Sequence, residues 1–251
     1  MLIYNLKTSQ GNVMCPEDFA VYMTRNPVTI HISNSLAFFL NQAKSQIDTN
    51  PDKWDLYKKI INPYEYIFSP VHKTSHCVAG FTPLSRSFFK MVEIANTFKL
   101  LAQYRDRPIR TYHLAEAPGG FIEAMAYLRN SAAYDDDVYH SMTLLSGERG
   151  VPTWSKIITK YKLNITRTNE LGKTVGKKIE LETGHDGRGD LLDPANFAEC
   201  VAKHRNTMDI MSGDGGFDFS KNFEEQEISA TRLLLAQILY ALMLQRGGGA
   251  L

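Results

Sequence analysis

The sequence predicts an α/β fold, a mostly parallel sheet with helices on both faces, preceded by a mainly helical N-terminal region. From about residue 81 onward, short apolar segments alternate with longer amphipathic ones, which is typical of a parallel sheet. Residues before Val78 contain only short helical patterns and loops. Of the 251 residues, 43% are hydrophobic and 22% charged, so the chain can bury a real core. We therefore predict a helical region over residues 1–78 and an α/β domain over residues 79–251.

The N-terminal region is expected to contain three short helices. The first is predicted over residues 16–25. Ser33 and Asn34 are cap candidates for the second, because apolar residues follow them at helical spacing. Pro51 can open the third, since proline is favoured at the first position of a helix.

Strands and helices alternate in the rest of the chain. Strands are predicted where short segments are apolar, and helices where apolar residues recur at spacings of three and four. In chain order we expect a helix over 83–102, a strand over 109–115, a helix over 119–128, a strand over 138–145, a helix over 153–161, strands over 165–168 and 178–181, a helix over 193–201, a strand over 208–212 and a helix over 222–245. Right-handed crossovers place the loops that follow the strands at one sheet edge, where open α/β sheets bind ligands.

Charge and cysteine content exclude several classes of protein. A net charge of +1 means that any nucleic-acid binding must use a local basic patch. Cys15, Cys77 and Cys200 are odd in number and far apart, so we predict no disulfide framework. This cysteine content is typical of a reducing, intracellular compartment, the cytoplasm or the nucleus. No apolar run approaches the roughly 20 residues of a membrane span, and the N-terminus lacks the pattern of a signal peptide.

Three segments carry residues suited to catalysis or ligand binding. Glu116 directly follows the strand over 109–115, at a position where a carboxylate can meet a cationic ligand. Gly119 and Gly120 come shortly after it. Asp214 lies just beyond the C-terminal end of the strand over 208–212 and also precedes two glycines. Lys90 lies among apolar residues of the helix over 83–102. Taken singly, glycines at such positions more often belong to ordinary strand–helix turns, and a lone lysine such as Lys90 more often lies on a helix surface.

Together, the segments resemble the FtsJ-like ribose 2′-O-methyltransferases, most closely the eukaryotic and viral mRNA cap branch. The similarity extends over roughly residues 81–249. It rests on five segments in the same order: Ser85-Arg-Ser-Phe-Phe-Lys-Met91, Glu116-Ala-Pro-Gly-Gly-Phe121, Gly189-Asp190, Asp214-Gly-Gly-Phe217, and Gln226-Glu227 with the leucine-rich helix and Gly247-Gly248.

The resemblance implies a Rossmann-like methyltransferase fold with S-adenosyl-L-methionine (SAM) as cofactor and RNA, above all capped mRNA, as partner. It assigns catalysis to Lys90 and Asp214, the first lysine and the aspartate of a Lys-Asp-Lys-Glu tetrad. The residues implied to contact SAM are Ser85, Glu116, Ala117, Pro118, Gly119, Gly120, Phe121, Asp190 and Asp214. Two alternatives stay open: an rRNA-type FtsJ enzyme, and a catalytically inactive module with the same fold that binds RNA or protein.

The second lysine and the glutamate of the tetrad are expected beyond Leu251. By this comparison the α/β domain is incomplete at its C-terminus, because the chain stops before the strand that would carry the lysine. We therefore expect an exposed sheet edge where that strand would pair.

Basic residues and possible metal ligands give two further expectations. Arg86, Lys173, Lys177 and Lys178 are candidate RNA contacts, the last three in a stretch over 169–178 that reads as a mobile loop. A solvated basic loop without RNA is the alternative. We predict no metal site, because the ligand types near His76 lack a fourth partner at a suitable spacing. The acidic run over 135–137 reads as a solvated turn.

Overall fold

The computed structural model describes residues 33–46, 51–71, 74, 76–130, 134–147, 151–162, 164–168, 174–216 and 226–251. Contacts divide the chain into two units, Met1–Pro63 and Tyr64–Leu251. The first unit contains helices α1 (Asn34–Ser45) and α2 (Pro51–Ile61), and the Ser33 side chain caps α1 as expected. The helix predicted over 16–25 lies outside the described residues, and the predicted boundary at residue 78 stays a prediction.

The second unit is built on a six-stranded sheet with the order β3-β4-β2-β1-β5-β6. All neighbouring strands run parallel except β3 and β4, which form an antiparallel pair. The strands are β1 (Arg110–Leu114), β2 (Val138–Met142), β3 (Asn164–Thr168), β4 (Thr174–Glu182), β5 (Met208–Gly213) and β6 (Gln245–Ala250). Leu114, the last residue of β1, lies beside Met142 and Gly213, so the loops after β1, β2 and β5 leave the sheet at one edge.

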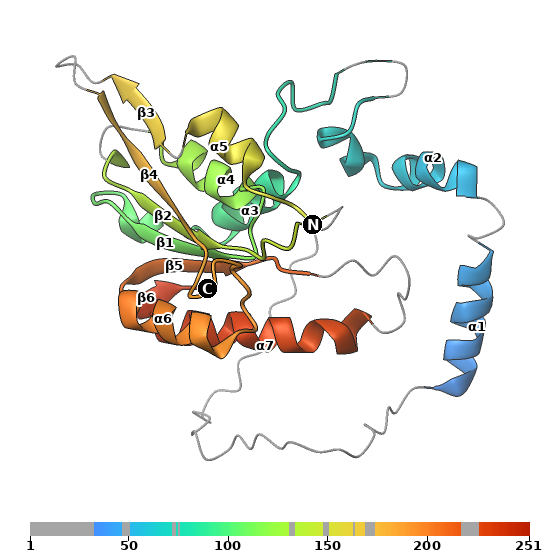
Figure 1. Ribbon diagram of the computed structural model, residues 1–251. Coiled ribbons are helices and arrows are strands. Elements are labelled where there is room, and N and C mark those ends of the chain that lie inside the picture. Colours follow the sequence, from blue (N-terminus) through green and yellow to red (C-terminus); the bar gives the residue numbers. More distant parts are fainter. Residues whose placement is uncertain are drawn as a thin grey trace, which may run out of the picture. The chain divides into compact units, whose positions relative to one another are not determined.

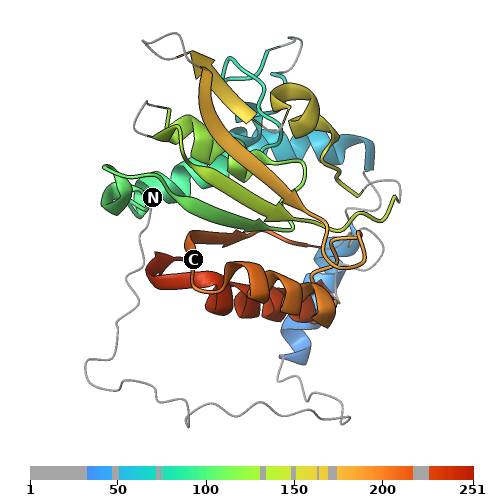
Figure 2. The ribbon, with the colours of Figure 1, turned by 60° about the vertical axis from the view of Figure 1, so that its left-hand side comes forward.

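Helices cover both faces of this sheet, as predicted (Figure 1). Helices α3 (Ser87–Thr97), α4 (Gly120–Leu128) and α5 (Ser155–Tyr161) lie on one face, and α6 (Pro194–His204) and α7 (Gln226–Leu244) on the other (Figures 1 and 2). Each face has its own buried cluster, centred on Phe88, Ile122 and Ile157 on the first and on Tyr112, Cys200 and Tyr240 on the second. The described residues also form 3-10 helices at Pro63–Ile67 and Ala102–Tyr104. Among the described helices, none has the length and apolar character that crossing a membrane requires.

Two expectations about secondary structure are corrected. Residues 174–178 are the first half of strand β4 and not part of a mobile loop, because they pair with β3 on one side and lead into the pairing with β2 on the other.

The strand expected only beyond Leu251 already begins at Gln245. Strand β6 includes all three glycines, since backbone pairing with the buried strand β5 offsets their low strand propensity. An ion pair of 2.6 Å from Arg246 to the buried Asp209 also holds β6 in place.

The acidic run before β2 is also corrected, because Asp137 is fully buried. Its carboxylate pairs with Arg129 at 2.7 Å, and both side chains are at most 2% exposed. The carboxylate also accepts hydrogen bonds from Ile109 N at 2.9 Å and from the Tyr139 hydroxyl at 3.0 Å. Asp137 therefore joins the end of α4 to the beginnings of β1 and β2.

A second buried carboxylate fixes the start of α3. Glu123, in the first turn of α4, accepts hydrogen bonds from Leu84 N at 2.6 Å and from the Tyr161 hydroxyl at 2.6 Å. It also pairs with Lys160 at 2.5 Å. Because Leu84 precedes α3, whereas Lys160 and Tyr161 belong to α5, one side chain joins three helices. This anchoring sets the position of α3, the helix that carries Lys90.

Candidate active site

The structure brings Lys90 and Asp214 together at the sheet edge. Lys90 lies in α3, and Asp214 directly follows β5, so 124 positions separate them along the chain. The ammonium of Lys90 donates to both carboxylate oxygens of Asp214, at 2.7 and 3.0 Å. The side chains are 53% and 39% exposed, so both remain accessible to a ligand. A cation and a carboxylate are therefore held in contact, facing solvent, where open α/β sheets bind ligands.

Glu116 lies close to this pair but in a different environment. It follows β1, the neighbour of β5, and is buried. Its carboxyl group accepts a hydrogen bond from the backbone N–H of Phe121, in the first turn of α4. Burial raises the pKa of Glu116 to about 8 and the nearby Asp214 adds to the shift, although the Phe121 hydrogen bond opposes it. In the free protein this side chain is therefore largely protonated at neutral pH, and a nearby cation would favour its ionised form.

The two glycines of the loop have different structural roles. Gly119 has φ +107°, a conformation that side chains disfavour, and it lets the chain turn from β1 into α4. Gly120 permits a close approach of α3 to α4. A Cβ at Gly120 would overlap the hydroxyls of Ser85 and Ser87 and lie 3.1 Å from Phe88 N. Ser85 and Ser87 share a hydrogen bond of 2.5 Å, and both hydroxyls pack against Gly120 in the loop that the family resemblance implies to contact SAM.

Gly120→Ala is expected to lower the free energy of unfolding by about 1–3 kcal/mol, the usual cost of overpacking. The added methyl group would push the start of α3 away from α4 and so displace Lys90 from Asp214. Denaturant unfolding measures the change. Gly247→Ala in β6 is the control, because a Cβ there meets no atom within 4 Å, and it should leave stability nearly unchanged. Equal effects of the two substitutions would contradict the packing role of Gly120.

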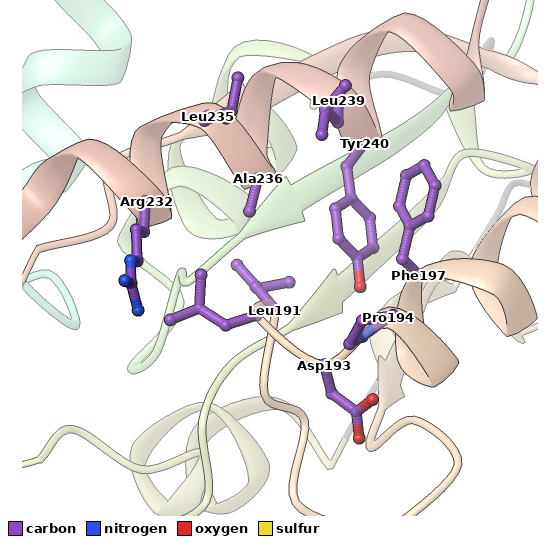
Figure 3. Close-up of a pocket in the computed structure, with 10 residues that line it drawn as sticks. Leu191, Asp193, Pro194, Phe197, Arg232, Leu235, Ala236, Leu239 and Tyr240 are labelled. Carbon is purple, nitrogen blue, oxygen red and sulfur yellow. The ribbon is translucent and has the colours of Figure 1, made fainter. Parts of the chain in front are cut away.

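Asp190 lies in the loop after β4, at the same sheet edge. Its carboxylate accepts a hydrogen bond from Leu192 N at 2.9 Å, and its backbone carbonyl accepts one from the Asn196 side chain at 3.0 Å. The described contacts do not join Asp190 to Lys90 or Glu116. The next residues border a largely apolar pocket of about 390 Å³ between α6 and α7. Figure 3 shows Leu191, Phe197 and Tyr240 around it. The sequence does not predict this pocket, because its lining residues come from two helices and a loop that are far apart in the chain.

Among the described residues, no contact joins Arg86 to Lys177 or Lys178. Arg86 precedes α3, with a side chain that is 70% exposed and 3.6 Å from Glu65. Lys173 lies outside the described residues. Lys177 is buried within β4, so its ammonium is not available to a phosphate in this structure. Lys178 follows it in β4, pairs with Glu180 at 2.5 Å and is 63% exposed. Their roles in RNA binding stay predictions.

Gln237 supports the Asp214 loop and was not identified from the sequence. Its side chain is buried in α7, where its amide oxygen accepts a hydrogen bond from Gly215 N at 3.1 Å. Its amide nitrogen donates to Leu233 O at 3.2 Å within the helix. A polar residue inside an apolar helix often makes a specific hydrogen bond, and this pattern could have pointed to Gln237.

The family model of the FtsJ-like methyltransferases matches residues 83–251. The cap-specific mRNA (nucleoside-2′-O-)-methyltransferase 2 of Danio rerio is 24% identical over 237 residues, which are 88% of this chain and 29% of that protein. The protein of the same name from Pongo abelii is 23% identical over 226 residues, 84% of this chain and 26% of that protein. The chain thus spans less than a third of the length of these relatives.

A solved structure from Methanococcus maripaludis, assigned as an S-adenosyl-L-methionine-dependent methyltransferase, aligns with a TM-score of 0.36 and 13% identity. The alignment covers 66% of this chain and 56% of that one. The family match includes the sheet, the helices on both of its faces and the Lys90–Asp214 pair. Because this match covers most of the chain, the protein belongs to the family of FtsJ-like methyltransferases.

Proposed function

We propose that this chain binds SAM at the sheet edge and supports methyl transfer to a ribose 2′-hydroxyl of RNA, at a cap-proximal nucleotide of mRNA. The observation that carries the proposal is the accessible Lys90–Asp214 pair, next to the Glu116–Gly120 loop and within an FtsJ-like domain. The similarity to two cap-specific methyltransferases supports the choice of capped mRNA as substrate.

The residues at the sheet edge fit a cofactor that carries positive charge. SAM has an ammonium and a sulfonium group, and the structure offers the carboxyl groups of Glu116 and Asp214 at the ends of two adjacent strands. The left-handed turn at Gly119 lets this loop pack against Ile157 of α5, since a Cβ there would lie 2.5 Å from Ile157 Cδ1. We propose that these groups hold SAM together with Ser85, Ala117, Pro118, Gly120, Phe121 and Asp190.

The bound SAM would supply an electrophilic methyl group for an in-line displacement. A ribose hydroxyl is a weak nucleophile and needs to lose its proton as the new bond forms. Lys90 is the proposed group that orients this hydroxyl, and its ammonium stabilises the negative charge that develops on the oxygen while the proton passes to solvent water. Asp214 holds the Lys90 ammonium through two hydrogen bonds and so fixes its direction. The anchoring of α3 by Glu123 keeps this geometry in place, which matters because alignment of the reacting groups supplies much of such a rate.

Methyl transfer from labelled SAM to capped and uncapped RNA of the same sequence tests this function. The proposal expects saturable SAM binding by the 251-residue chain and a higher transfer rate on capped RNA. Absence of SAM binding at high ligand concentration would overturn the cofactor assignment. Equal rates on both RNAs would favour general RNA 2′-O-methylation, and SAM binding without transfer would favour a binding module.

SAM binding is also expected to depend on pH through Glu116. Because the pKa of Glu116 is raised to about 8 mainly by burial, the free protein holds a proton there below that pH. A bound cation favours the carboxylate, so SAM affinity should rise as pH increases towards 8 and then level off, with proton release on binding below pH 8. Calorimetry in buffers of different ionisation enthalpy measures the release.

Glu116→Gln is the matched variant, since it keeps the shape of the side chain without an ionisable group. It should bind SAM more weakly and without proton release. Proton release that persists at the same level in this variant would show that another group titrates.

A further inference from the structure

Three potential metal ligands converge on the sheet face beneath α6. They are His140 in β2, Glu182 at the end of β4 and His204 at the end of α6, and one ligand atom from each lies within 4.8 Å of the others. Nε2 of His204 is 2.5 Å from Glu182 Oε1, and Nδ1 of His140 is 3.6 Å from the same oxygen. The two rings are 4.6 Å apart between centroids. Two imidazoles therefore face one carboxylate in a largely buried space.

Cys200 lies beside this cluster and offers a third kind of ligand atom, although its sulfur is not one of the atoms that lie within 4.8 Å of one another. It precedes His204 by four residues in α6, the spacing that places two side chains on one face of a helix. Its sulfur lies 3.6 Å from Glu182 Oε2 and 3.0 Å from the Tyr112 hydroxyl.

Unpartnered nitrogens give a second, independent indication of a ligand. His140 is fully buried, and its Nδ1 forms no aligned hydrogen bond with any described residue, although Glu180 and Glu182 lie within 3.1 and 3.6 Å. Nδ1 of His204 also lacks an aligned hydrogen bond within the described part of the chain. Buried polar atoms in native proteins usually have a partner. Here one such nitrogen, His140 Nδ1, points towards the carboxylate that His204 also contacts.

We propose that His140, Glu182 and His204, with Cys200 as the fourth ligand, form a binding site for a divalent transition metal of the Zn²⁺ type. Imidazole nitrogen, carboxylate oxygen and thiolate sulfur are the ligands that Zn²⁺ takes in tetrahedral sites. The ligands come from β2, β4 and α6, so the metal would fasten α6 to the sheet (Figure 2). Two glutamates, Glu180 and Glu182, supply negative charge around the cation. This inference does not depend on the proposed methyl transfer.

Arg110 opposes metal binding in the present arrangement. Its guanidinium lies 3.1 Å from Nε2 of His140. Since arginine only donates hydrogen bonds, Nε2 accepts and the proton of a neutral ring resides on Nδ1. A metal bound at Nδ1 moves the proton to Nε2, which then no longer accepts from Arg110. The residue is exposed at the start of β1, so its side chain can move into solvent. Removing Arg110 should therefore strengthen metal binding.

Titration of the chelator-treated 251-residue chain with Zn²⁺ and with Co²⁺ tests the site. We expect one high-affinity equivalent of Zn²⁺, and with Co²⁺ the intense visible bands of four-coordinate geometry plus a thiolate charge-transfer band. His204→Gln should lower Zn²⁺ affinity by at least the roughly 10- to 100-fold seen when outer-shell partners are lost. Arg110→Gln should raise it. His185→Gln is the control, since His185 is an exposed histidine in the loop after β4 and outside the cluster.

Two cysteine variants keep the proposal testable if His204→Gln fails to fold. Cys200→Ser fills nearly the same space and should abolish the thiolate band, whereas Cys77→Ser, at a free cysteine in the segment before α3, should retain it. Circular dichroism without metal confirms that each variant is folded. The proposal is overturned if wild type binds Zn²⁺ no more tightly than folded His204→Gln, or if Cys200→Ser retains the full thiolate band.

Discussion

Lys90→Met is expected to lower the rate of RNA 2′-O-methyl transfer by about 10²- to 10³-fold, the range lost when a donor that stabilises developing negative charge is removed. The substitution keeps the length of the side chain in α3 but removes the ammonium that contacts both oxygens of Asp214. Because Glu116 and the Gly119 turn stay in place, SAM affinity should change little. Transfer of labelled methyl groups to capped RNA at saturating SAM gives the rate, and equilibrium titration gives the affinity.

Lys203→Met is the matched control for this experiment. Lys203 is also an exposed helical lysine, 51% accessible, and it pairs with a carboxylate, Glu199, at 2.5 Å. Its ion pair lies in α6, away from the Asp214 loop, so the variant should transfer methyl groups at the wild-type rate. A Lys90→Met protein with an unchanged rate would remove Lys90 from the proposed chemistry. A loss in SAM affinity as large as the loss in rate would assign Lys90 to cofactor binding instead.

Local patterns in the sequence contain most of the information about the sheet. Short apolar segments, each followed by a turn and a helix, predict β1, β2 and β5 and their common edge. The parallel order then places Glu116 and Asp214 at the ends of adjacent strands. The proximity of Lys90 to Asp214 followed only from the family resemblance, because no local pattern relates positions 124 residues apart.

Long-range partners explain the predictions that were wrong. Asp137 looks like part of a solvated acidic turn, yet Arg129 and two backbone carbonyls, those of Tyr104 and Arg107, complete a buried polar network around the pair. The glycines of β6 have a low strand propensity, so the sequence does not predict a strand there. Pairing with β5 overrides this propensity. Lys177 reads as a loop cation but lies buried in a strand.

The histidine cluster could not have been read from the sequence for the same reason. His140, Glu182 and His204 belong to three elements, and only the Cys200–His204 spacing within α6 was a local signal. Each residue alone is unremarkable in type and position. These ligand atoms come together because β2 and β4 are neighbouring strands of the sheet.

Arg129→Met is expected to lower the free energy of unfolding by about 3–5 kcal/mol, the cost of leaving a buried charge without its partner. The guanidinium donates to Asp137 at 2.7 and 3.0 Å and to the carbonyls of Tyr104 and Arg107 at 2.9 and 2.7 Å. Methionine fills the space of the aliphatic stem but leaves the Asp137 carboxylate buried beside apolar atoms. Urea unfolding measures the loss, and Arg105→Met, at an exposed arginine nearby, should cost less than about 1 kcal/mol.

The double variant Arg129→Met with Asp137→Leu separates charge burial from lost packing. Replacing both members of a buried pair by apolar residues is often nearly neutral. Here recovery should be partial, because Ile109 N and the Tyr139 hydroxyl lose the carboxylate that accepts their hydrogen bonds. The double variant should therefore be more stable than Arg129→Met and less stable than wild type. If it is no more stable than Arg129→Met, the loss comes from the missing contacts to Tyr104 and Arg107, and the uncompensated charge of Asp137 is not its cause.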